Sequence, residues 1–310
     1  MKANLRVVAT MSRVTLHVVV GLLLVGVVFR VRGPADRRAM VRWWSRRLLR
    51  ICRLRVRVMR SPPAADGPAG RAWIDAAIES ALRPDGGGAM LVSNHVSWLD
   101  IFVIHALRPA RFVAKAEIAR WPLLGFLVSR TGAIFVERGK RHAVRDVNQR
   151  AAESLREGDL VGMFPEGTVG NNERLLPFHA NLVQPAIDAG VPIVVAGVRY
   201  RDPNGAPTRA IDYTGDVTLL QSLGRIARHG PLVADLHLIT AIDGTATTRH
   251  DAVRAARAAI ADALRFDDEA QEAAEGLSTV IVVPDDPLTR ANVMASIQPG
   301  TLLDPRDELL

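Results

Sequence analysis

The stretch AMLVSNHVSWLD, residues 89–100, decides the fold. Residues 89–93 are an apolar run that predicts a buried strand, and a helix is expected to begin near Ser97. Further apolar runs then alternate with segments of helical periodicity. We expect strands at 89–93, 111–114, 132–136, 160–164, 193–198 and 232–238, and helices at 72–82, 99–107, 121–129, 143–157, 180–189, 216–228 and 248–264. This alternation predicts an α/β fold with a largely parallel central sheet flanked by helices.

An uncharged apolar run, VTLHVVVGLLLVGVVF, occupies residues 14–29 between Arg13 and Arg30. As a helix it would be about 24 Å long, short of the ~30 Å hydrocarbon core of a bilayer. A tilted span, a re-entrant helix, a signal peptide and a buried core helix are therefore all open. Because no A-x-A-like cleavage site follows, we expect an uncleaved, membrane-associated helical segment.

The charge of the chain is strongly asymmetric. Residues 1–60 carry fifteen Lys or Arg and one acid, whereas residues 267–310 carry ten acids and two Arg. Ten arginines lie in 37–60, and some of them recur at helical spacing next to an apolar stripe that includes Trp44, with Trp43 beside it. This pattern predicts a basic amphipathic helix on an anionic leaflet, facing the cytoplasm. Nucleic acid is the rival partner, but the run directly follows a membrane-grade apolar segment.

Three regions follow from these patterns. Residues 1–60 are expected to be a membrane anchor with a basic amphipathic helix, 61–266 an α/β catalytic domain, and 267–310 an acidic extension to which the sequence assigns no role. The single cysteine, Cys52, excludes an internal disulfide and is interpreted as an apolar filler. We predict no metal site.

The first chemical signal is the pair His95 and Asp100. His95 lies on a strand-to-helix turn, where α/β proteins place ligands, and a turn residue can fold back to meet Asp100. A carboxylate bonded to one imidazole nitrogen fixes the tautomer, so that the other nitrogen can accept a hydroxyl proton. On its own such a pair is more often incidental, and His95 is then a structural histidine.

Three further motifs end predicted strands or join them to helices. FPEGT at 164–168 forms a turn that carries Glu166, and GAIFVER at 132–138 brings Arg138 to a strand end. A guanidinium there suits a phosphate, although an ion pair with a neighbour is an equal interpretation. The junction GVPI at 190–193 is interpreted as structural.

These motifs, in this order and spacing, resemble the glycerolipid acyltransferase family, in particular the bacterial lysophosphatidate acyltransferases. The resemblance implies that His95 is the general base on the sn-2 hydroxyl of lysophosphatidate and that Asp100 orients it. It implies that Arg138 holds the acceptor phosphate, with Lys115 adding charge, and that the acceptor site is shaped by Glu166, Gly167 and Thr168. The acyl donor would be acyl-CoA or acyl-carrier protein, with no cofactor and no acyl-enzyme, on the inner, cytoplasmic membrane. The product would be phosphatidate.

One departure from the family pattern concerns the acceptor. Val169 follows Glu-Gly-Thr where the family often has arginine, and the substitutes in the sequence are Arg174 and His179. Another acceptor, such as lyso-ornithine lipid, is therefore the nearest alternative. Two other classes are open as well. One is a serine hydrolase using Ser93 or Ser97, although the chain has no Gly-x-Ser-x-Gly elbow, and the other is a non-catalytic membrane-binding protein.

Overall fold

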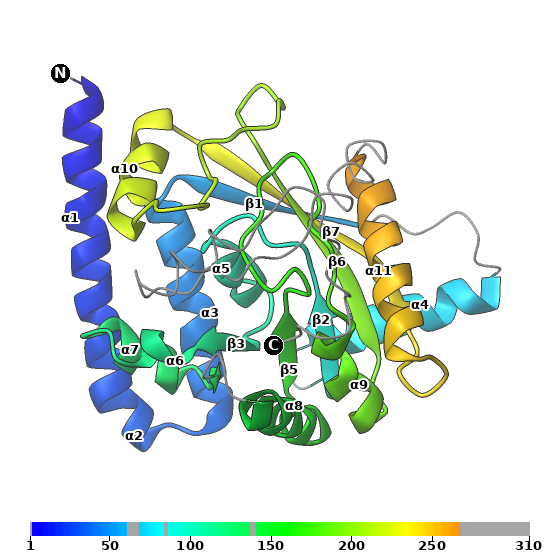
Figure 1. Ribbon diagram of the computed structural model, residues 1–310. Coiled ribbons are helices and arrows are strands. Elements are labelled where there is room, and N and C mark those ends of the chain that lie inside the picture. Colours follow the sequence, from blue (N-terminus) through cyan, green and yellow to red (C-terminus); the bar gives the residue numbers. More distant parts are fainter. Residues whose placement is uncertain (1, 61–67, 84–85, 137–140, 267–310) are drawn as a thin grey trace, which may run out of the picture.

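A seven-stranded sheet forms the centre of the computed structural model, which describes residues 2–60, 68–83, 86–136 and 141–266 (Figure 1). The strand order is β1-β7-β6-β2-β5-β3-β4, and all neighbours are parallel except β6 and β7. The strands are β1 Leu54–Arg60, β2 Ala89–Val92, β3 Arg111–Lys115, β4 Ile134–Val136, β5 Leu160–Met163, β6 Ile193–Arg201 and β7 Leu232–Ile242. The predicted mostly parallel α/β fold is confirmed.

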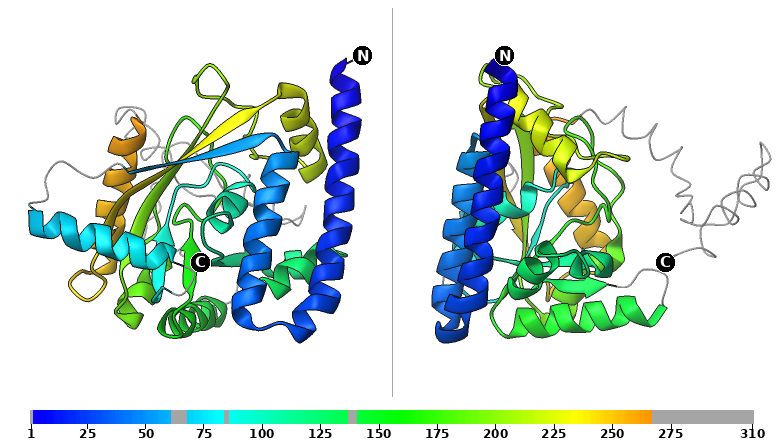
Figure 2. Two further views of the ribbon diagram at one scale, coloured as in Figure 1. Left: turned by 180° about the vertical axis from the view of Figure 1, so that it is seen from behind. Right: turned by 90° about the vertical axis from the view of Figure 1, so that its left-hand side faces the viewer.

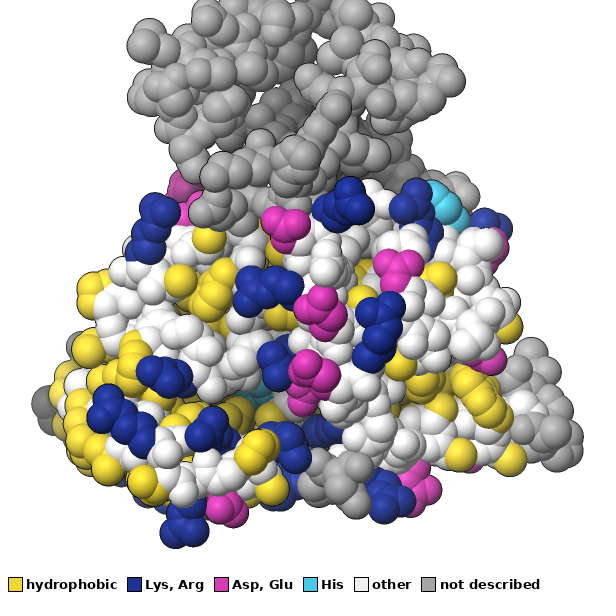
Figure 3. Space-filling view, turned by 90° about the horizontal axis from the view of Figure 1, so that it is seen from below, with side chains coloured by type: hydrophobic (Ala, Val, Ile, Leu, Met, Phe, Trp, Pro, Cys, Tyr) yellow, Lys and Arg dark blue, Asp and Glu magenta, His cyan; other side chains and the backbone are white. Residues whose placement is uncertain are grey.

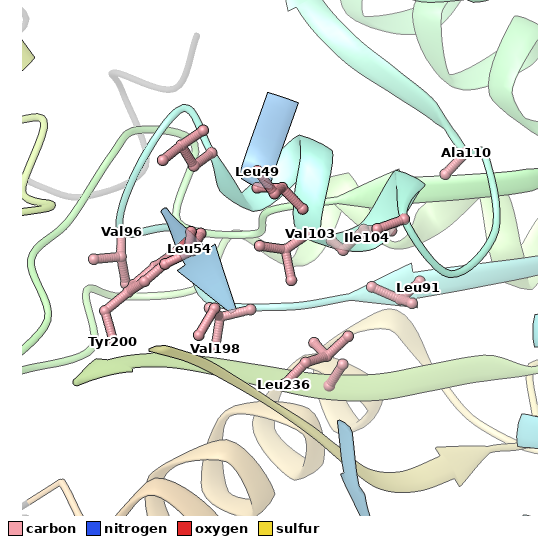
Figure 4. Packing of buried hydrophobic residues seen from close by; sticks show 14 of the residues in the cluster. Leu49, Leu54, Leu91, Val96, Val103, Ile104, Ala110, Val198, Tyr200 and Leu236 are labelled. Atoms are coloured by element: carbon pink, nitrogen blue, oxygen red, sulfur yellow. The ribbon is translucent and has the colours of Figure 1, made fainter. Parts of the chain in front are cut away.

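Two hydrophobic cores lie on opposite faces of this sheet. Successive side chains of a strand point to opposite faces, so Leu91 belongs to one core while Met90 and Val92 belong to the other. The first core is covered by α3 Pro34–Ile51, α4 Pro68–Leu82, α5 Asp100–His105 and α10 Leu219–His229. The second is covered by α8 Arg141–Arg156, α9 Gln184–Ala189 and α11 Arg249–Leu264. Figure 4 shows Leu91 of β2 facing Val103 and Ile104 of α5 in the first core.

The N-terminal helix lies along the flank of the α/β body (Figures 1 and 2). It consists of α1 Lys2–Leu23, a π-helical turn Leu24–Val28 and α2 Phe29–Val31. It is joined to α3 by His17 and Trp44, whose rings stack 4.4 Å apart while each ring nitrogen bonds the other residue's carbonyl oxygen. Among the described residues, the helix Asn4–Val31 is the one that is long and apolar enough to cross a membrane.

The basic segment is helical only in its first part, and the strand that the apolar/polar alternation of residues 54–58 indicates is present. The helix ends at Ile51, and Leu54–Arg60 joins the edge of the sheet as β1. Arg57 therefore does not continue the helical stripe; its guanidinium forms a two-point ion pair with buried Asp235 of β7, at 2.6 and 2.8 Å. The acidic extension 267–310 lies outside the described residues.

Two short helices, α6 Ala116–Ala119 and α7 Leu124–Arg130, follow β3 where the sequence predicted one helix. Between them Trp121 and Leu123 are exposed, and Leu123 adopts a left-handed backbone conformation with φ of 64°. The inner side of α7 packs on α1, because Leu127 approaches Gly21. This pair of helices therefore extends the apolar flank that α1 begins.

Candidate active site

The turn between β2 and α5 is built around the carboxylate of Asp100. Its Oδ2 accepts hydrogen bonds from the backbone N–H of Val96 at 2.7 Å and of Ser97 at 2.9 Å, and Nδ1 of His95 lies 2.8 Å from the same oxygen. The Asp100 side chain is fully buried. The chain from His95 to Asp100, with four residues between them, thus wraps once around this carboxylate.

The imidazole of His95 is held in one tautomer by this contact. Because a carboxylate oxygen only accepts hydrogen bonds, Nδ1 carries the proton and Nε2 carries the lone pair. Nε2 has no hydrogen-bond partner among the residues that the structure describes, and the side chain is 15% exposed. The ring stacks on Phe164 with 4.0 Å between centroids. This arrangement can take a proton from a hydroxyl group that approaches Nε2.

Glu166 faces inward from the turn after β5. Its Oε1 accepts the backbone N–H of His95 at 2.8 Å, and its Oε2 accepts that of Leu176 at 3.2 Å. Burial raises the pKa of Glu166 to about 8, although the two backbone N–H groups and Arg257 act in the opposite direction. Glu166 thus ties the catalytic turn to the loop at Leu176, and its expected part in shaping the acceptor site stays a prediction.

Gly167 and Thr168, in contrast, lie at the surface of the same turn. Gly167 has φ of 66°, a conformation that favours glycine, and a Cβ there would lie 3.3 Å from the His179 ring. His179 is therefore next to the turn. Both residues, unlike Glu166, are placed where a ligand can reach them.

The remaining predicted cations follow neighbouring strands of the sheet. Lys115 ends β3 and is exposed, at the same edge as His95 and Glu166, because β2, β5 and β3 are parallel. β4 ends at Val136 at this edge too, but Arg138 lies outside the described residues. Arg174 is exposed, on the loop after the Glu166 turn.

Sequence reasoning missed two buried residues that complete this site. The Tyr200 hydroxyl donates to Oδ1 of Asp100 at 2.5 Å. The Asn94 amide bonds both the N–H and the C=O of Val198, at 2.8 and 2.9 Å. Asn94 is adjacent to His95, but nothing local distinguishes Tyr200, which lies a hundred residues beyond Asp100.

An apolar cavity of about 160 Å³ lies beneath the N-terminal helices. Its wall includes residues of the helices α1, α3, α5 and α7, and Phe112 of β3. The Phe112 ring stacks on Phe164, 5.4 Å away, and Phe164 stacks on His95. Gly162 permits this approach, because a Cβ there would lie 2.3 Å from the Phe112 ring. Two stacked phenyl rings thus connect the cavity wall to the imidazole.

Comparison with known proteins places this site in a family. A family model described as Acyltransferase matches residues 77–199, which include His95, Asp100 and Glu166. A lyso-ornithine lipid O-acyltransferase from Pseudomonas aeruginosa is 34% identical over 268 residues, covering 84% of this chain and 95% of that protein. The chain belongs to the acyltransferase family.

Two further acyltransferases extend the comparison. The 1-acyl-sn-glycerol-3-phosphate acyltransferase of Neisseria gonorrhoeae is 38% identical over 156 residues, covering 50% of this chain and 61% of that protein. The crystal structure of the 1-acyl-sn-glycerophosphate acyltransferase PlsC from Thermotoga maritima matches with a TM-score of 0.59 at 18% identity, covering 85% of this chain and 95% of that one. The solved structure shares the fold, and the expected resemblance is confirmed.

Family membership and geometry both disfavour the serine hydrolase. Ser93 and Ser97 are fully buried. The Ser93 hydroxyl lies 3.5 Å from Oδ1 of Asn94, and the Ser97 hydroxyl accepts from the N–H of Leu99. The acyltransferase thus has its two nearest serines facing the interior. Family membership also favours an enzyme over a non-catalytic binding protein, because the relatives named above are acyltransferases.

Proposed function

We propose that this acyltransferase moves a fatty acyl group from acyl-CoA or acyl-carrier protein to the sn-2 hydroxyl of lysophosphatidate, giving phosphatidate. The observation that carries the mechanism is the His95–Asp100 pair, held at 2.8 Å with Nε2 of His95 left to accept a proton. The side chains of the site supply this chemistry, and we propose no further cofactor.

Proton transfer and acyl transfer are coupled in this mechanism. The acceptor oxygen attacks the thioester carbonyl carbon while its proton moves to Nε2 of His95. The buried carboxylate of Asp100 stabilises the imidazolium. Collapse of the tetrahedral intermediate breaks the carbon–sulfur bond, and the proton passes from His95 to the leaving thiolate. The products are the acylated lipid and the free thiol.

The negative charge on the tetrahedral intermediate needs hydrogen-bond donors. The backbone N–H groups of His95, Val96 and Ser97 already donate to Glu166 and Asp100. The next loop lies close by, because Gly170 donates its N–H to the His95 carbonyl at 2.7 Å. This bond brings residues 168–169 to the catalytic turn, where their backbone N–H groups can serve as donors. We assign the oxyanion to backbone N–H groups of this loop.

The apolar cavity is the proposed site of an acyl chain. Its lining is overwhelmingly apolar, and Phe112 of its wall stacks on Phe164, which in turn stacks on the catalytic imidazole. Burial lowers the pKa of His105, one of its few polar wall residues, to about 4, so this imidazole is neutral at physiological pH. A neutral apolar wall suits a hydrocarbon chain and excludes the charged headgroup.

The membrane surface is the proposed location of the enzyme. Exposed apolar residues run along the N-terminal helix: Leu5, Val8, Leu16, Val19, Leu23, Val27 and Val31. On the side of the molecule that α1, α6 and α7 occupy, hydrophobic side chains gather with Lys and Arg side chains among them (Figure 3). Because α1 packs along α10, α3 and α7, we propose that it lies within one leaflet. The positive-inside rule assigns that leaflet to the cytoplasmic face of the inner membrane.

The acceptor headgroup has a second candidate, lyso-ornithine lipid. The relative that aligns with 95% of its length carries that name, whereas the N. gonorrhoeae relative aligns over half of this chain. Val169 also removes a cation beside Thr168, which lowers the positive charge available to a phosphate. The same His95 chemistry serves either acceptor, because both present a hydroxyl group.

A panel of acceptors tests the proposal. Purified wild-type enzyme in anionic vesicles is given labelled acyl-CoA and, separately, lysophosphatidate, lyso-ornithine lipid and a neutral lysolipid. We expect phosphatidate as the fastest product. Faster labelling of lyso-ornithine lipid would show that this lipid, and not lysophosphatidate, is the preferred acceptor. Release of free fatty acid without lipid labelling would overturn acyl transfer altogether.

A further inference from the structure

Asp100 has a second buried partner besides His95. Its Oδ2 is occupied by the catalytic turn, and its Oδ1 accepts the Tyr200 hydroxyl at 2.5 Å. The Tyr200 side chain has no exposed surface. Burial, together with the charge of Asp100, raises the pKa of Tyr200 well above 10, so that the phenol remains a donor at any physiological pH.

The backbone of Tyr200 is fixed by a third buried residue, Asn172. The Asn172 Oδ1 accepts the N–H of Tyr200 at 2.8 Å, and its Nδ2 donates to the Tyr200 carbonyl at 2.6 Å. The same Nδ2 also lies 3.1 Å from the Thr208 carbonyl oxygen. A side-chain amide thus replaces a neighbouring strand at this point of β6 and leaves the phenol little freedom to move.

A matching clamp holds the other end of this contact. Asn94, directly before His95, makes the same pair of bonds to Val198, two residues before Tyr200 on β6. Asn94 therefore anchors the catalytic turn to β6, the strand that also carries Tyr200. Three fully or nearly fully buried polar side chains that serve only packing would be costly, because apolar residues fill such space without desolvation.

We propose that Tyr200 is a positioning residue for acyl transfer, which fixes the Asp100 carboxylate so that it orients His95. With Oδ2 held by the turn and Oδ1 held by the phenol, the carboxylate cannot rotate about its Cβ–Cγ bond. The phenol also draws negative charge away from the oxygen that faces the imidazole. The inference rests on the proposed role of His95 and Asp100.

Loss of the Tyr200 hydroxyl should move the pH dependence of kcat/KM in one definite direction. The titratable groups around Asp100 are His95 and Tyr200, in direct contact, and Glu166, whose carboxyl in turn faces Arg257. Without the Tyr200 bond the carboxylate becomes more basic and holds the imidazolium form of His95 more strongly. The acid limb of kcat/KM, which reports protonation of the base, then moves to higher pH.

The test compares Tyr200→Phe with Tyr213→Phe, which removes the hydroxyl of the other tyrosine in the chain. We expect the acid limb to move up by about one pH unit in Tyr200→Phe only, consistent with a hydrogen bond to a charged group. The KM for the acceptor and for the donor should not change. A purely structural role would lower the rate equally at every pH, so a limb that coincides with that of the wild type overturns the inference.

A second variant preserves the packing of the site. In the Tyr213→Phe protein, 3-fluorotyrosine enters only position 200 and makes the phenol a stronger donor. The acid limb should then move down, opposite to Tyr200→Phe, and a shift in the same direction contradicts the inference. The two proposals fail separately. An active His95→Ala enzyme would contradict the catalytic role of His95 and Asp100. An acid limb that does not shift in Tyr200→Phe, in an enzyme that still depends on His95, would contradict only the role of Tyr200.

Discussion

Replacement of Glu166 by Gln tests whether the buried carboxyl group of Glu166, which bridges two backbone N–H groups, is protonated in the native state. Both carboxyl oxygens accept backbone N–H groups, from His95 and Leu176, inside a buried turn. Burial raises the pKa of Glu166 to about 8, against 4.5 for a solvated glutamate. Between these two values the native state holds a proton that the unfolded chain has released.

The magnitude follows from linkage. One additional proton on the native state lowers the free energy of unfolding by about 1.4 kcal/mol for each pH unit, so the stability that Glu166 contributes is complete below pH 4.5 and is lost as pH rises through 8. His105 acts in the opposite sense, because burial lowers its pKa from 6.5 to about 4. Its contribution offsets that of Glu166 up to about pH 6.5. The expected net loss between pH 6.5 and 8 is about 2 kcal/mol.

Denaturant unfolding of the detergent-solubilised enzyme, followed by tryptophan fluorescence, measures this loss. Glu166→Gln forfeits one hydrogen bond, at a cost of about 1 kcal/mol at every pH, because the amide nitrogen cannot accept a backbone N–H. It should also lack the fall between pH 6.5 and 8, which the exposed control Glu157→Gln should retain. A difference between wild type and Glu166→Gln that stays constant across this range would refute the reasoning, since Glu166 would then be ionised in the native state.

Three further outcomes are expected. If Arg138 holds the acceptor phosphate, as the resemblance implies, Arg138→Ala should raise the KM for lysophosphatidate with little change in kcat; a change confined to the KM of the thioester would move Arg138 to the donor site. Val128→Phe fills the apolar cavity and should lower kcat/KM for palmitoyl-CoA at least tenfold more than for decanoyl-CoA, a difference of about 1.4 kcal/mol; equal losses with both donors would exclude the cavity as the acyl site. Leu16→Arg with Leu23→Arg should release the enzyme from phosphatidylglycerol vesicles in flotation assays, because both side chains are exposed on the N-terminal helix; undiminished flotation would contradict the proposed membrane face.

The central strands were predictable from the sequence because they are short apolar runs between turn residues. β2 and β5 are buried at every position, which a parallel strand covered on both faces requires. The antiparallel direction of β7 was not predictable, since it depends on the path of residues 202–231 between β6 and β7. Nor was the pairing of β1 with β7, because the alternation of residues 54–58 indicates a strand but not its partner, which lies about 180 residues away.

The site was predictable where its motifs follow adjacent parallel strands. His95 after β2 and Glu166 after β5 had to meet at one edge of the sheet. The sequence could not tell which side of the FPEGT turn faces inward, and the structure shows that Glu166 bonds the backbone of the catalytic turn. Tyr200 and Asn172 gave no local signal, because their roles depend on contacts with residues far away in the chain.

Acyl transfer by a His95→Ala enzyme tests the central claim most directly. The variant and wild type are purified, shown to have the same unfolding transition, and assayed with labelled acyl-CoA and lysophosphatidate in anionic vesicles. Loss of the general base predicts a fall in kcat of about 10²–10⁴-fold, and Asp100→Asn should approach the same loss because the wrong tautomer is held. A His95→Ala enzyme that transfers the acyl group at the wild-type rate would contradict the account.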